Sequence, residues 1–465
     1  MNITNRKMET PLNQKAKQYR NTSMMDLIHK LWFLKRDLVS DDYDQALFRL
    51  AEEVPMVIHE YPTGEPCWTW TVPEKWTCHE AYLETLDGQR LIDYADHPLH
   101  VVSYSLPFEG VVSREELFKH LHVNPHWSDA IPYVFKYYQR DWGLCMSQDQ
   151  RDTLINEAYR VVIRTTFEPG TLKVGEVIIP GKSEQTFVLI AHLCHPAMVS
   201  DDLSGVVLGV DVTRKLLSDC NANRRYTYRY LIVPETIGSL AYLSHNEKLI
   251  PNMVGGLFLE SLGVDSPHSL QQSFAGMELG KNLQPDRCLT TAIRQLDPQA
   301  FTGPYRSVAK NDEAQFNAPG VRVPMLSISR AWSQQPPSGP FYYGYHSSHD
   351  TPEIVSVERL EASRDLVLGL IDAWEKNQYV VNDFKGEVFC SKYGIWVDYR
   401  ENPEDWQLLF RVMEYCDGEH TVADIAVNLD TSFQAVWSVV AQLLEKGLVW
   451  LSSTPQPTDP RLSIG

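Results

Sequence analysis

The chain has 465 residues, of which 43% are apolar and 22% are charged, and its formal net charge is −18. This length indicates two or three domains, and the composition is typical of a soluble globular protein. The acidic balance disfavours nucleic acid and anionic membranes as partners, because phosphate binding needs clustered Lys and Arg. We expect no secretory signal in the polar N-terminus and no membrane span, since no window approaches the roughly 18 consecutive apolar residues of a spanning helix.

Changes in sequence character divide the chain into four expected segments. Leu, Trp and Phe recur at helical spacing over 24–54, with a break near Ser40 that suits a helix cap. Short alternating runs with prolines and turn dipeptides then predict small β-rich structure. From about 130 to 380, strands alternate with helices, and after 400 three apolar-periodic helices precede a strand-like "GLVWL". The expected segments are 1–56, N-terminal helices that join the catalytic domain; 57–128, an inserted β-rich domain; 129–382, the catalytic domain; and 383–465, a winged helix-turn-helix-like domain.

The alternating region predicts an α/β fold with a mostly parallel sheet and helices on both faces. In such sheets ligands gather at the carboxyl ends of the strands. His192, Glu235 and Glu260 each lie where a predicted strand ends. This shared position is more informative than any one of the residues, and it predicts a site at this edge of the sheet.

The polar residues near the strand ends have the composition of a hydrolytic metal site. Imidazoles and carboxylates together suit zinc, manganese or iron, and a catalytic zinc needs about three protein ligands and an open position. A further carboxylate is needed to take a proton from water and pass it to the leaving group. The candidates are His192, Asp201, Glu235, Glu260 and His346.

Each of these residues also has an ordinary structural interpretation. Asp201 or Asp202 equally suits the cap of the helix that starts near Leu203, and His346 lies in a polar loop where His is common. The metal hypothesis therefore depends on the joint arrangement and not on any single residue.

The joint arrangement resembles the zinc aminopeptidases of the bacterial leucyl aminopeptidase and glutaminyl cyclase clan. "AHLCHPAMVSDDLSGV" is similar to their His-x-Asp and Asp-Asn-x-Ser-Gly motif, "VPETIGSLAYL" to their Glu-Glu-x-Gly segment and "YHSSHDTPE" to their final His motif. The resemblance implies a zinc-exopeptidase-like fold and one or two zinc ions, with Asp201 as the bridge if two bind. The implied ligands are His192, Asp201, Glu260 and His346, and the implied general base is Glu235.

A narrower resemblance covers nearly the whole chain. "WTWTVPEKW", "HVVSYSLPFEG" and "AIPYVFKYYQRDWGLCMS" look like bacterial aminopeptidase-like proteins with a small inserted domain and a C-terminal winged helix. That family often occurs beside polysaccharide or secondary-metabolite biosynthesis. It implies this architecture and a biosynthetic context.

The chain departs from the clan pattern at two positions. Cys194 replaces the second carboxylate of His-x-Asp, and Thr236 replaces the second residue of Glu-Glu. Threonine is a poor zinc ligand, so at least one zinc is expected and the second is left open. A one-residue slip of the alignment would make Glu235 a ligand instead of the base.

Several further residues are candidates for substrate contacts. His195 suits an added ligand, a substrate contact or a structural hydrogen bond, and His349 suits a supporting role near His346. Asp312 and Glu313 suit either a substrate ammonium group or a solvated acidic turn. Arg330 suits either a bidentate contact with a substrate carboxylate or an internal ion pair.

These observations predict a zinc-dependent aminopeptidase-like amidohydrolase. The expected substrate is a small peptide or amide, or an aminoacylated biosynthetic intermediate. The alternative is an aminoacyl transferase, a cyclase or a degenerate metal-binding scaffold on the same fold. The winged helix raises DNA binding as a third class, but residues 404–452 carry eight acidic residues and, as bases, only Arg411 and Lys446. We expect a packing, dimer or gating module, with a homo-oligomer possible. The scattered cysteines without a Cys-x-x-Cys pair indicate a reduced, cytoplasmic protein.

Overall fold

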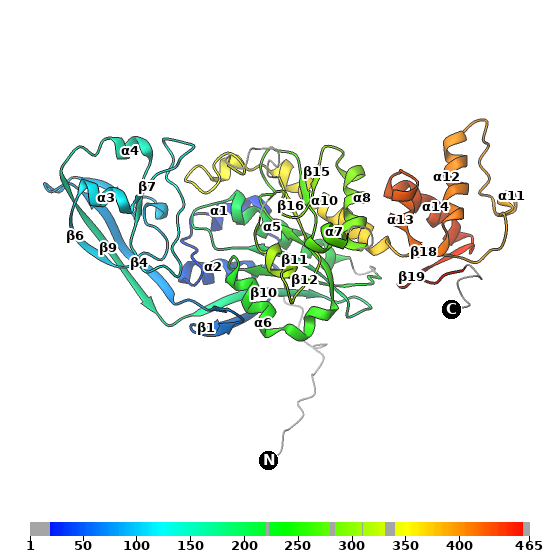
Figure 1. Ribbon diagram of the computed structural model, residues 1–465, viewed down its shortest axis with the longest axis horizontal. Coiled ribbons are helices and arrows are strands. Elements are labelled where there is room, and N and C mark those ends of the chain that lie inside the picture. Colours follow the sequence, from blue (N-terminus) through cyan, green and yellow to red (C-terminus); the bar gives the residue numbers. More distant parts are fainter. Residues whose placement is uncertain (1–18, 220–222, 280–283, 309, 331–339, 459–465) are drawn as a thin grey trace, which may run out of the picture.

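The computed structural model describes residues 19–219, 223–279, 284–308, 310–330 and 340–458. It is elongated, with a central sheet and its helices in the middle, a smaller sheet at one end and a helical part at the other (Figure 1). Within these residues, no helix is long and apolar enough to span a membrane.

The central sheet has eight strands, in the order β1-β10-β12-β11-β13-β16-β14-β15. The four middle strands β12, β11, β13 and β16 are parallel. The pairs β1–β10, β10–β12 and β14–β16 are antiparallel, and β15 pairs parallel with β14. The α/β prediction with a mostly parallel sheet is confirmed. The bounds are β1 (Val57–Pro62), β10 (Thr171–Ile179), β11 (Thr186–His192), β12 (Thr227–Val233), β13 (Met253–Leu259), β14 (Ser269–Gln271), β15 (Phe301–Gly303) and β16 (Met325–Ser329).

Helices cover both faces of this sheet. The crossover from β11 to β12 and the crossover from β12 to β13 run in opposite directions across the sheet, so right-handed connections place their helices on opposite faces. The helices of the central part are α1 (Met24–Leu31), α2 (Asp41–Leu50), α5 (Gly205–Ser218), α6 (Ile237–His245), α7 (Phe274–Leu279), α8 (Gln284–Leu296), α9 (Glu313–Asn317) and α10 (Val357–Lys376), with the short turns η2 (Ser200–Ser204), η3 (Glu247–Asn252) and η4 (Pro352–Ile354). The expected cap at Ser40 is present, since its hydroxyl accepts the backbone N–H of Tyr43.

The strand register brings the predicted site residues to one edge of the sheet. His192 ends β11 opposite Val233 of β12, and Glu260 directly follows β13. Glu235 lies two residues beyond the end of β12. Every residue of β11 is buried, as expected of a strand with a helix layer on each face.

The smaller sheet extends past the expected boundary at residue 128. Its order is β5-β4-β9-β6, and β9 (Ala158–Glu168) lies in its middle. β1, at the start of the expected insert, belongs to the central sheet instead. The boundaries 57 and 128 therefore miss both junctions, because pairing between distant strands is not visible in local alternation. The remaining elements are β2 (Pro66–Cys67), β3 (Trp70–Thr71), β4 (Lys75–Glu84), β5 (Arg90–Asp93), η1 (Pro98–His100), β6 (Phe108–Ser113), α3 (Arg114–His120), β7 (Leu121–His122), β8 (Leu144–Cys145) and α4 (Gln148–Asp152).

The C-terminal part combines helices with a three-stranded sheet in the order β18-β17-β19. It packs on the central part through α8, where Arg287 Nε lies 2.9 Å from Asp424 Oδ1. Strand β17 lies before residue 383, so this sheet crosses the expected boundary there. The elements are β17 (Tyr379–Asn382), α11 (Cys390–Tyr393), α12 (Pro403–Glu414), β18 (Asp417–Thr421), α13 (Val422–Asn428), α14 (Phe433–Glu445) and β19 (Val449–Ser452).

Candidate metal centre

The site is built on the segment that leaves β11 and enters α5. The chain turns at η2, where Asp201 has an extended backbone conformation, with φ −110° and ψ 94°. The start of α5 then approaches β13 so closely that a Cβ on Gly205 would lie 2.1 Å from the carbonyl oxygen of Leu259. Only glycine fits there, and this contact holds the loop 193–204 against the edge of the sheet.

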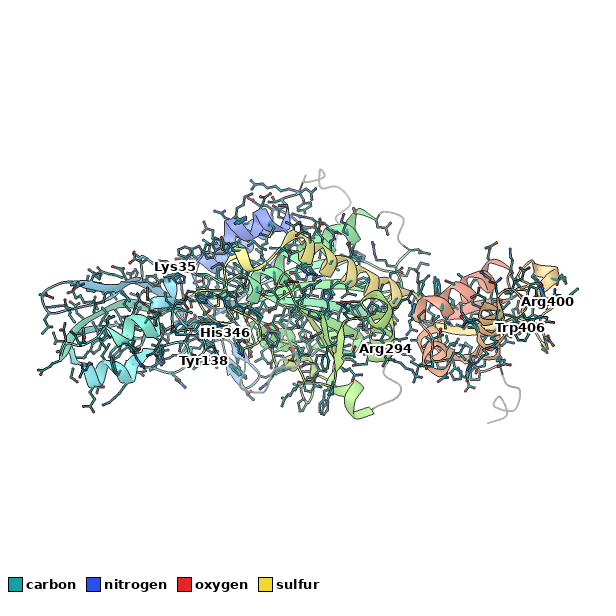
Figure 2. The ribbon with its side chains drawn as sticks, turned by 90° about the horizontal axis from the view of Figure 1, so that it is seen from above. Lys35, Tyr138, Arg294, His346, Arg400 and Trp406 are labelled. Carbon is teal, nitrogen blue, oxygen red and sulfur yellow. The ribbon has the colours of Figure 1, made fainter. Side chains whose placement is uncertain are left out.

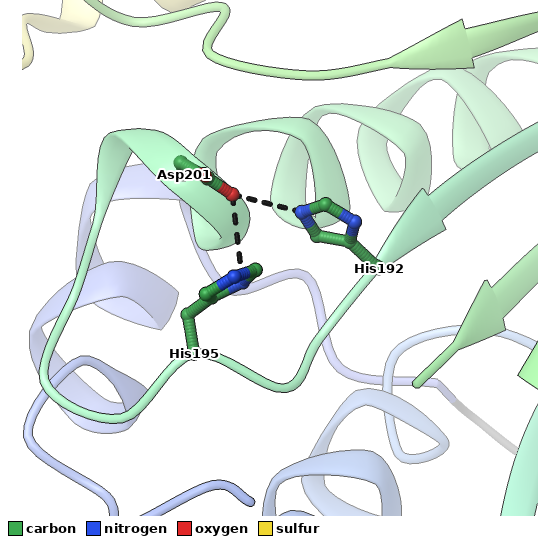
Figure 3. Close-up of side chains that lie close together, drawn as sticks. All are labelled: His192, His195 and Asp201. Atoms are coloured by element: carbon green, nitrogen blue, oxygen red, sulfur yellow. Dashed lines mark hydrogen bonds and ion pairs between the residues drawn. The ribbon is translucent and has the colours of Figure 1, made fainter. Parts of the chain in front are cut away.

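Asp201 is the centre of the cluster. Its Oδ1 lies 2.8 Å from Nε2 of His192 and 3.5 Å from Nδ1 of His195, and its Oδ2 lies 3.1 Å from Nε2 of His346 (Figure 3 shows the first two). One ligand atom from each of His192, His195 and Asp201 can be chosen so that all lie within 4.8 Å of one another. The structure thus brings together two predicted ligands and one residue whose role the sequence left open.

The imidazole of His195 is buried without hydrogen bonds. Both of its ring nitrogens are inaccessible and have no hydrogen-bond partner among the residues that the structure describes. Nε2 lies 3.6 Å from Oε2 of Glu235, and Nδ1 lies 3.4 Å from Oδ2 of Asp202. A structural hydrogen bond therefore does not explain the ring, and a ligand that bonds to these nitrogens would.

Glu260 presents a second buried atom without a partner. Its Oε1 accepts a hydrogen bond from Nδ2 of Asn311 and lies 4.0 Å from Nε2 of His192. Its Oε2 is buried and has no partner in the described part of the chain. Asn311 also places its Oδ1 3.1 Å from Nδ1 of His192. Asn311 thus links two candidate ligands, a role that nothing in its local sequence indicated.

Asp312 is a support for His192 and not a free carboxylate for a substrate ammonium group. The side chain is fully buried, and its Oδ2 lies 3.1 Å from Nδ1 of His192. Its Oδ1 accepts the backbone N–H of Thr236 at 2.9 Å and the hydroxyl of Ser239 at 2.5 Å. The ammonium interpretation is wrong because packing leaves neither oxygen accessible. Asp312 supplies the orienting carboxylate that Cys194 replaces in the local motif.

Glu313 is also buried and engaged. Its carboxylate accepts the backbone N–H of Asn311 and the side-chain amide of Gln271. Burial raises its pKa to about 7. Neither alternative, a substrate ammonium contact or a solvated acidic turn, fits Glu313, because it starts α9 with its side chain buried.

A buried ion pair fixes the far side of the loop. Nη1 of Arg36 lies 2.6 Å from Oδ1 of Asp202, and both side chains are fully buried. Nη2 of Arg36 donates to the carbonyl of Met198, and Oδ2 of Asp202 accepts the backbone N–H of His195. Asp202 therefore positions His195. Arg36 has no local motif, so the sequence analysis missed it.

His346 is held by residues from two directions. Its carbonyl accepts the backbone N–H of Tyr133, whose ring lies 5.4 Å from the imidazole of His346 and 5.1 Å from that of His195. Figure 2 places His346 where the central part meets the smaller sheet. Nearby, Asp350 accepts the backbone N–H groups of Ser200 and Asp201. Asp350 thus supports the backbone of the loop that carries Asp201, and Tyr133 is a neighbour that local sequence did not indicate.

Glu235 is the accessible carboxylate of the cluster. Its side chain is 23% exposed, and its backbone N–H donates to Sγ of Cys194. Burial raises the pKa of Cys194 well above its usual range, so this thiol stays neutral. Thr236 follows with a left-handed backbone, φ 62°, which sets the sharp turn between β12 and α6.

Two candidates lie away from the cluster. Arg330 donates from Nε to the hydroxyl of Ser363 and from Nη1 to the carbonyl of Ser266, in a cavity beside β14. His349 stacks on Tyr343 and places Nε2 3.4 Å from Asp129. The contacts that the structure gives Arg330 and His349 are with residues outside the cluster, and a substrate contact by either residue stays a prediction.

The electrostatics of the cluster favour a cation. Burial opposes ionisation of Asp201, but the imidazoles of His195, His192 and His346 hold its pKa well below the usual range. For Glu260, burial and then the charge of Asp201 raise the pKa well above the usual range. A divalent ion beside Glu260 would reverse that shift, because positive charge favours the carboxylate. The orphaned atoms and the mixed imidazole–carboxylate donors fit a zinc-type ion.

Comparisons with known proteins agree with the architecture. A family model described as "Domain of unknown function (DUF4910)" matches residues 25–377. A curated protein from Clostridium acetobutylicum is 30% identical over 418 residues, covers 88% of this chain and 92% of its own length, and bears the name of a polysaccharide biosynthesis protein with an aminopeptidase-like domain.

Solved structures show the same fold. A crystal structure from Clostridium acetobutylicum, named as a peptidase, has a TM-score of 0.81 and 29% identity over 92% of this chain and 96% of its own. BSAP, a zinc aminopeptidase from Bacillus subtilis, has a TM-score of 0.55 and 13% identity over 75% of this chain and 93% of its own. The likeness to BSAP shows that the central part has the fold of an aminopeptidase.

Proposed function

The chain belongs to the family described as "Domain of unknown function (DUF4910)". We propose that it is a zinc-dependent hydrolase. It cleaves an amide or peptide bond in a small peptide or an aminoacylated biosynthetic intermediate. The observation that carries the proposal is the buried cluster of His192, His195 and Asp201, with both nitrogens of His195 left without partners.

The proposed ligands are the side chains gathered around Asp201 together with Glu260, of which His195 and Glu260 have buried atoms without a partner among the described residues. His192, Asp201, Glu260 and His346 keep the roles expected of them, and His195 joins them. When bound, zinc supplies Lewis acidity that polarises a carbonyl oxygen and makes hydroxide available near neutral pH. Thr236 contributes only its backbone N–H, which Asp312 accepts. The set of proposed ligands supports at least one zinc, and the number of ions is to be measured.

Glu235 is the proposed general base. It is the cluster's partly exposed carboxylate, next to His195 and at the end of β12. Its oxygen takes a proton from the attacking water and gives it to the leaving nitrogen, so one group serves both halves of the reaction. The hydrogen bond from its backbone N–H to Cys194 and the turn at Thr236 hold the side chain at the edge of the site.

His192 is oriented from behind. With its Nδ1–H donated to Asp312, the ring presents Nε2 towards Asp201. Arg36 and Asp202 hold the backbone of His195 in the same way. These contacts keep the ligand atoms in place before a metal or substrate arrives.

The surroundings support a small substrate handled in biosynthesis. Residues 131–133, which bond to the loop 346–348, cover one side of the cluster and limit access to it. The name of the Clostridium acetobutylicum relative supports a biosynthetic context. The C-terminal part, for which the sequence predicts a winged helix, is proposed as a packing module that binds no nucleic acid. The proposed reaction needs neither a membrane nor a homo-oligomer.

The test combines metal content with hydrolysis. Purified full-length protein is loaded with zinc and assayed on aminoacyl amides and aminoacyl p-nitroanilides. We expect hydrolysis that a chelator abolishes and zinc restores. Glu235→Gln should lower kcat by at least about 100-fold, the range of a lost general base, while zinc content is unchanged. Glu419→Gln, an exposed carboxylate of the C-terminal part, is the matched control.

The outcomes separate the candidate functions. Zinc binding without hydrolysis of any amide, or full activity in Glu235→Gln, contradicts the hydrolase. Zinc binding with aminoacyl transfer or cyclisation in place of hydrolysis would favour the alternative of a transferase or cyclase. The threonine at position 236, where the resembling aminopeptidases have a second Glu, supports that alternative. Absence of metal together with absence of activity would leave a degenerate scaffold.

A further inference from the structure

A cavity of about 740 Å³ adjoins the metal cluster. It shares two walls with the cluster. One is Asn311, which contacts His192 and Glu260, and the other is Thr236, which directly follows Glu235. Ligand cavities of proteins usually measure about 300–1,000 Å³, so a group the size of an amino acid or a sugar fits there. A molecule whose scissile bond lies at the cluster therefore extends one end into this space.

The charge of this cavity is opposite to that of the protein. Among the described residues, its lining includes three cations, Arg306, Lys310 and Arg322, and no carboxylate. The whole chain, in contrast, has a net charge of −18. All three side chains are exposed. A local cluster of one sign in a chain of the other sign attracts ligands of the chain's own sign.

None of the three cations is within salt-bridge distance of a carboxylate among the described residues. This sets them apart from Arg36, Arg214, Arg229 and Arg287, each of which has an ion-pair partner. Arg322 instead lies over the ring of Phe274 at 4.3 Å and donates from Nη1 to the carbonyl of Asn317, and Arg306 lies over the ring of Tyr305 at 5.3 Å. The aromatic contacts hold the guanidinium groups of both arginines over the rings and leave N–H donors at their edges for a ligand.

We propose that the substrate carries an anionic group, a carboxylate or a phosphate, which binds in this cavity while its amide lies at the metal cluster. This inference rests on the proposed function for the position of the amide and names the substrate class. Arg306 and Arg322 offer planar donor pairs that match carboxylate and phosphate oxygens, and Lys310 adds a point charge next to Asn311. The cavity is thus a specificity site and the cluster the reaction site.

The test measures binding separately from hydrolysis. Zinc-loaded Glu235→Gln protein is titrated calorimetrically with matched pairs of C-terminally amidated dipeptides, Leu-Glu against Leu-Gln and Glu-Leu against Gln-Leu. Leu-phosphoserine against Leu-Ser separates phosphate from carboxylate. We expect the anionic member of at least one pair to bind at least about tenfold more tightly, as one or two charge-assisted contacts supply.

A charge-matched pair of variants identifies the source of the preference. The first variant should reduce the preference for the anionic ligand to less than about threefold, since only screened long-range charge remains. It combines Arg306→Gln, Lys310→Gln and Arg322→Gln. The combination Arg294→Gln, Lys385→Gln and Arg411→Gln removes three exposed cations elsewhere and should keep it. Equal or undetectable binding of both members of every pair, or a preference that survives the first combination, overturns the inference. An anion preference without hydrolysis contradicts the proposed function alone, and hydrolysis without an anion preference contradicts this inference alone.

Discussion

Two polar clusters lie at the same edge of the central sheet, and they differ in whether their buried polar atoms have hydrogen-bond partners among the described residues. Beyond β11 and β13, the nitrogens of His195 and Oε2 of Glu260 are buried without partners. Beside β14, the nitrogens of His268 lie 2.6 Å from Asp297 Oδ2 and 2.9 Å from the Ser363 hydroxyl, and Arg330 also donates to Ser363. A cluster of polar residues at strand ends therefore indicates a ligand site when some of its buried polar atoms remain unsatisfied after folding.

The largest expected effect is at the ion pair that holds the first cluster. Arg36→Met removes the partner of Asp202 and leaves a fully buried carboxylate, which should lower the free energy of unfolding by about 3–5 kcal/mol. Chemical denaturation measures this, and adding Asp202→Asn should recover much of the loss. Arg400→Met, which breaks an exposed pair with Asp398, is the control and should change stability by less than about 1 kcal/mol. Equal effects of the two Arg→Met changes would contradict the proposed support of the loop.

A smaller effect is expected at the residue that orients His192. Asp312→Asn keeps the shape but weakens the hold on Nδ1, so the affinity for zinc should fall by about 10–100-fold, as for other residues behind a metal ligand. Competition with a chromogenic chelator measures the affinity. Asp286→Asn, at a buried carboxylate bonded to Ser273, is the matched control and should leave zinc binding unchanged. An unchanged affinity in Asp312→Asn would show that this carboxylate does not position the ligand.

The second cluster predicts a pH effect unrelated to metal. Burial, reinforced by Arg330, lowers the pKa of His268 from 6.5 to about 4. The folded state thus disfavours the protonated ring, and its contribution to stability is lost as the pH falls from about 6.5 towards 4. Between pH 7 and pH 5, the stability difference between wild type and His268→Gln should shift by about 2 kcal/mol in favour of the variant. A constant difference across this range would contradict a neutral, paired His268.

Local sequence predicted the strands and helices of the central sheet well. The apolar runs that end at His192 and before Glu260 are buried on both faces, which makes their pattern continuous and easy to identify. The small sheet was harder, because β9 pairs with β4 across more than 70 residues of chain. Long-range pairing of this kind leaves no local signal, so the boundary at 128 was misplaced.

The residues of the site also fall into those that local sequence predicts and those that depend on long-range packing. His192, Asp201, Glu260 and His346 follow from strand ends and motif order, and the structure brings them together. The roles of Asp312 and Arg36 did not follow, because each depends on packing between segments more than 100 residues apart. Cys194 was nevertheless a usable signal, since a missing carboxylate beside His192 implies that another segment supplies one.

The zinc content of Asp201 and Asp297 variants tests the contrast between the two clusters most directly. Wild type, Asp201→Asn and Asp297→Asn are each exposed to zinc, desalted and analysed by elemental mass spectrometry. We expect at least one zinc per chain in wild type and in Asp297→Asn, and loss of that zinc in Asp201→Asn. A wild type without zinc, or an Asp201→Asn variant that retains as much as wild type, would contradict this expectation.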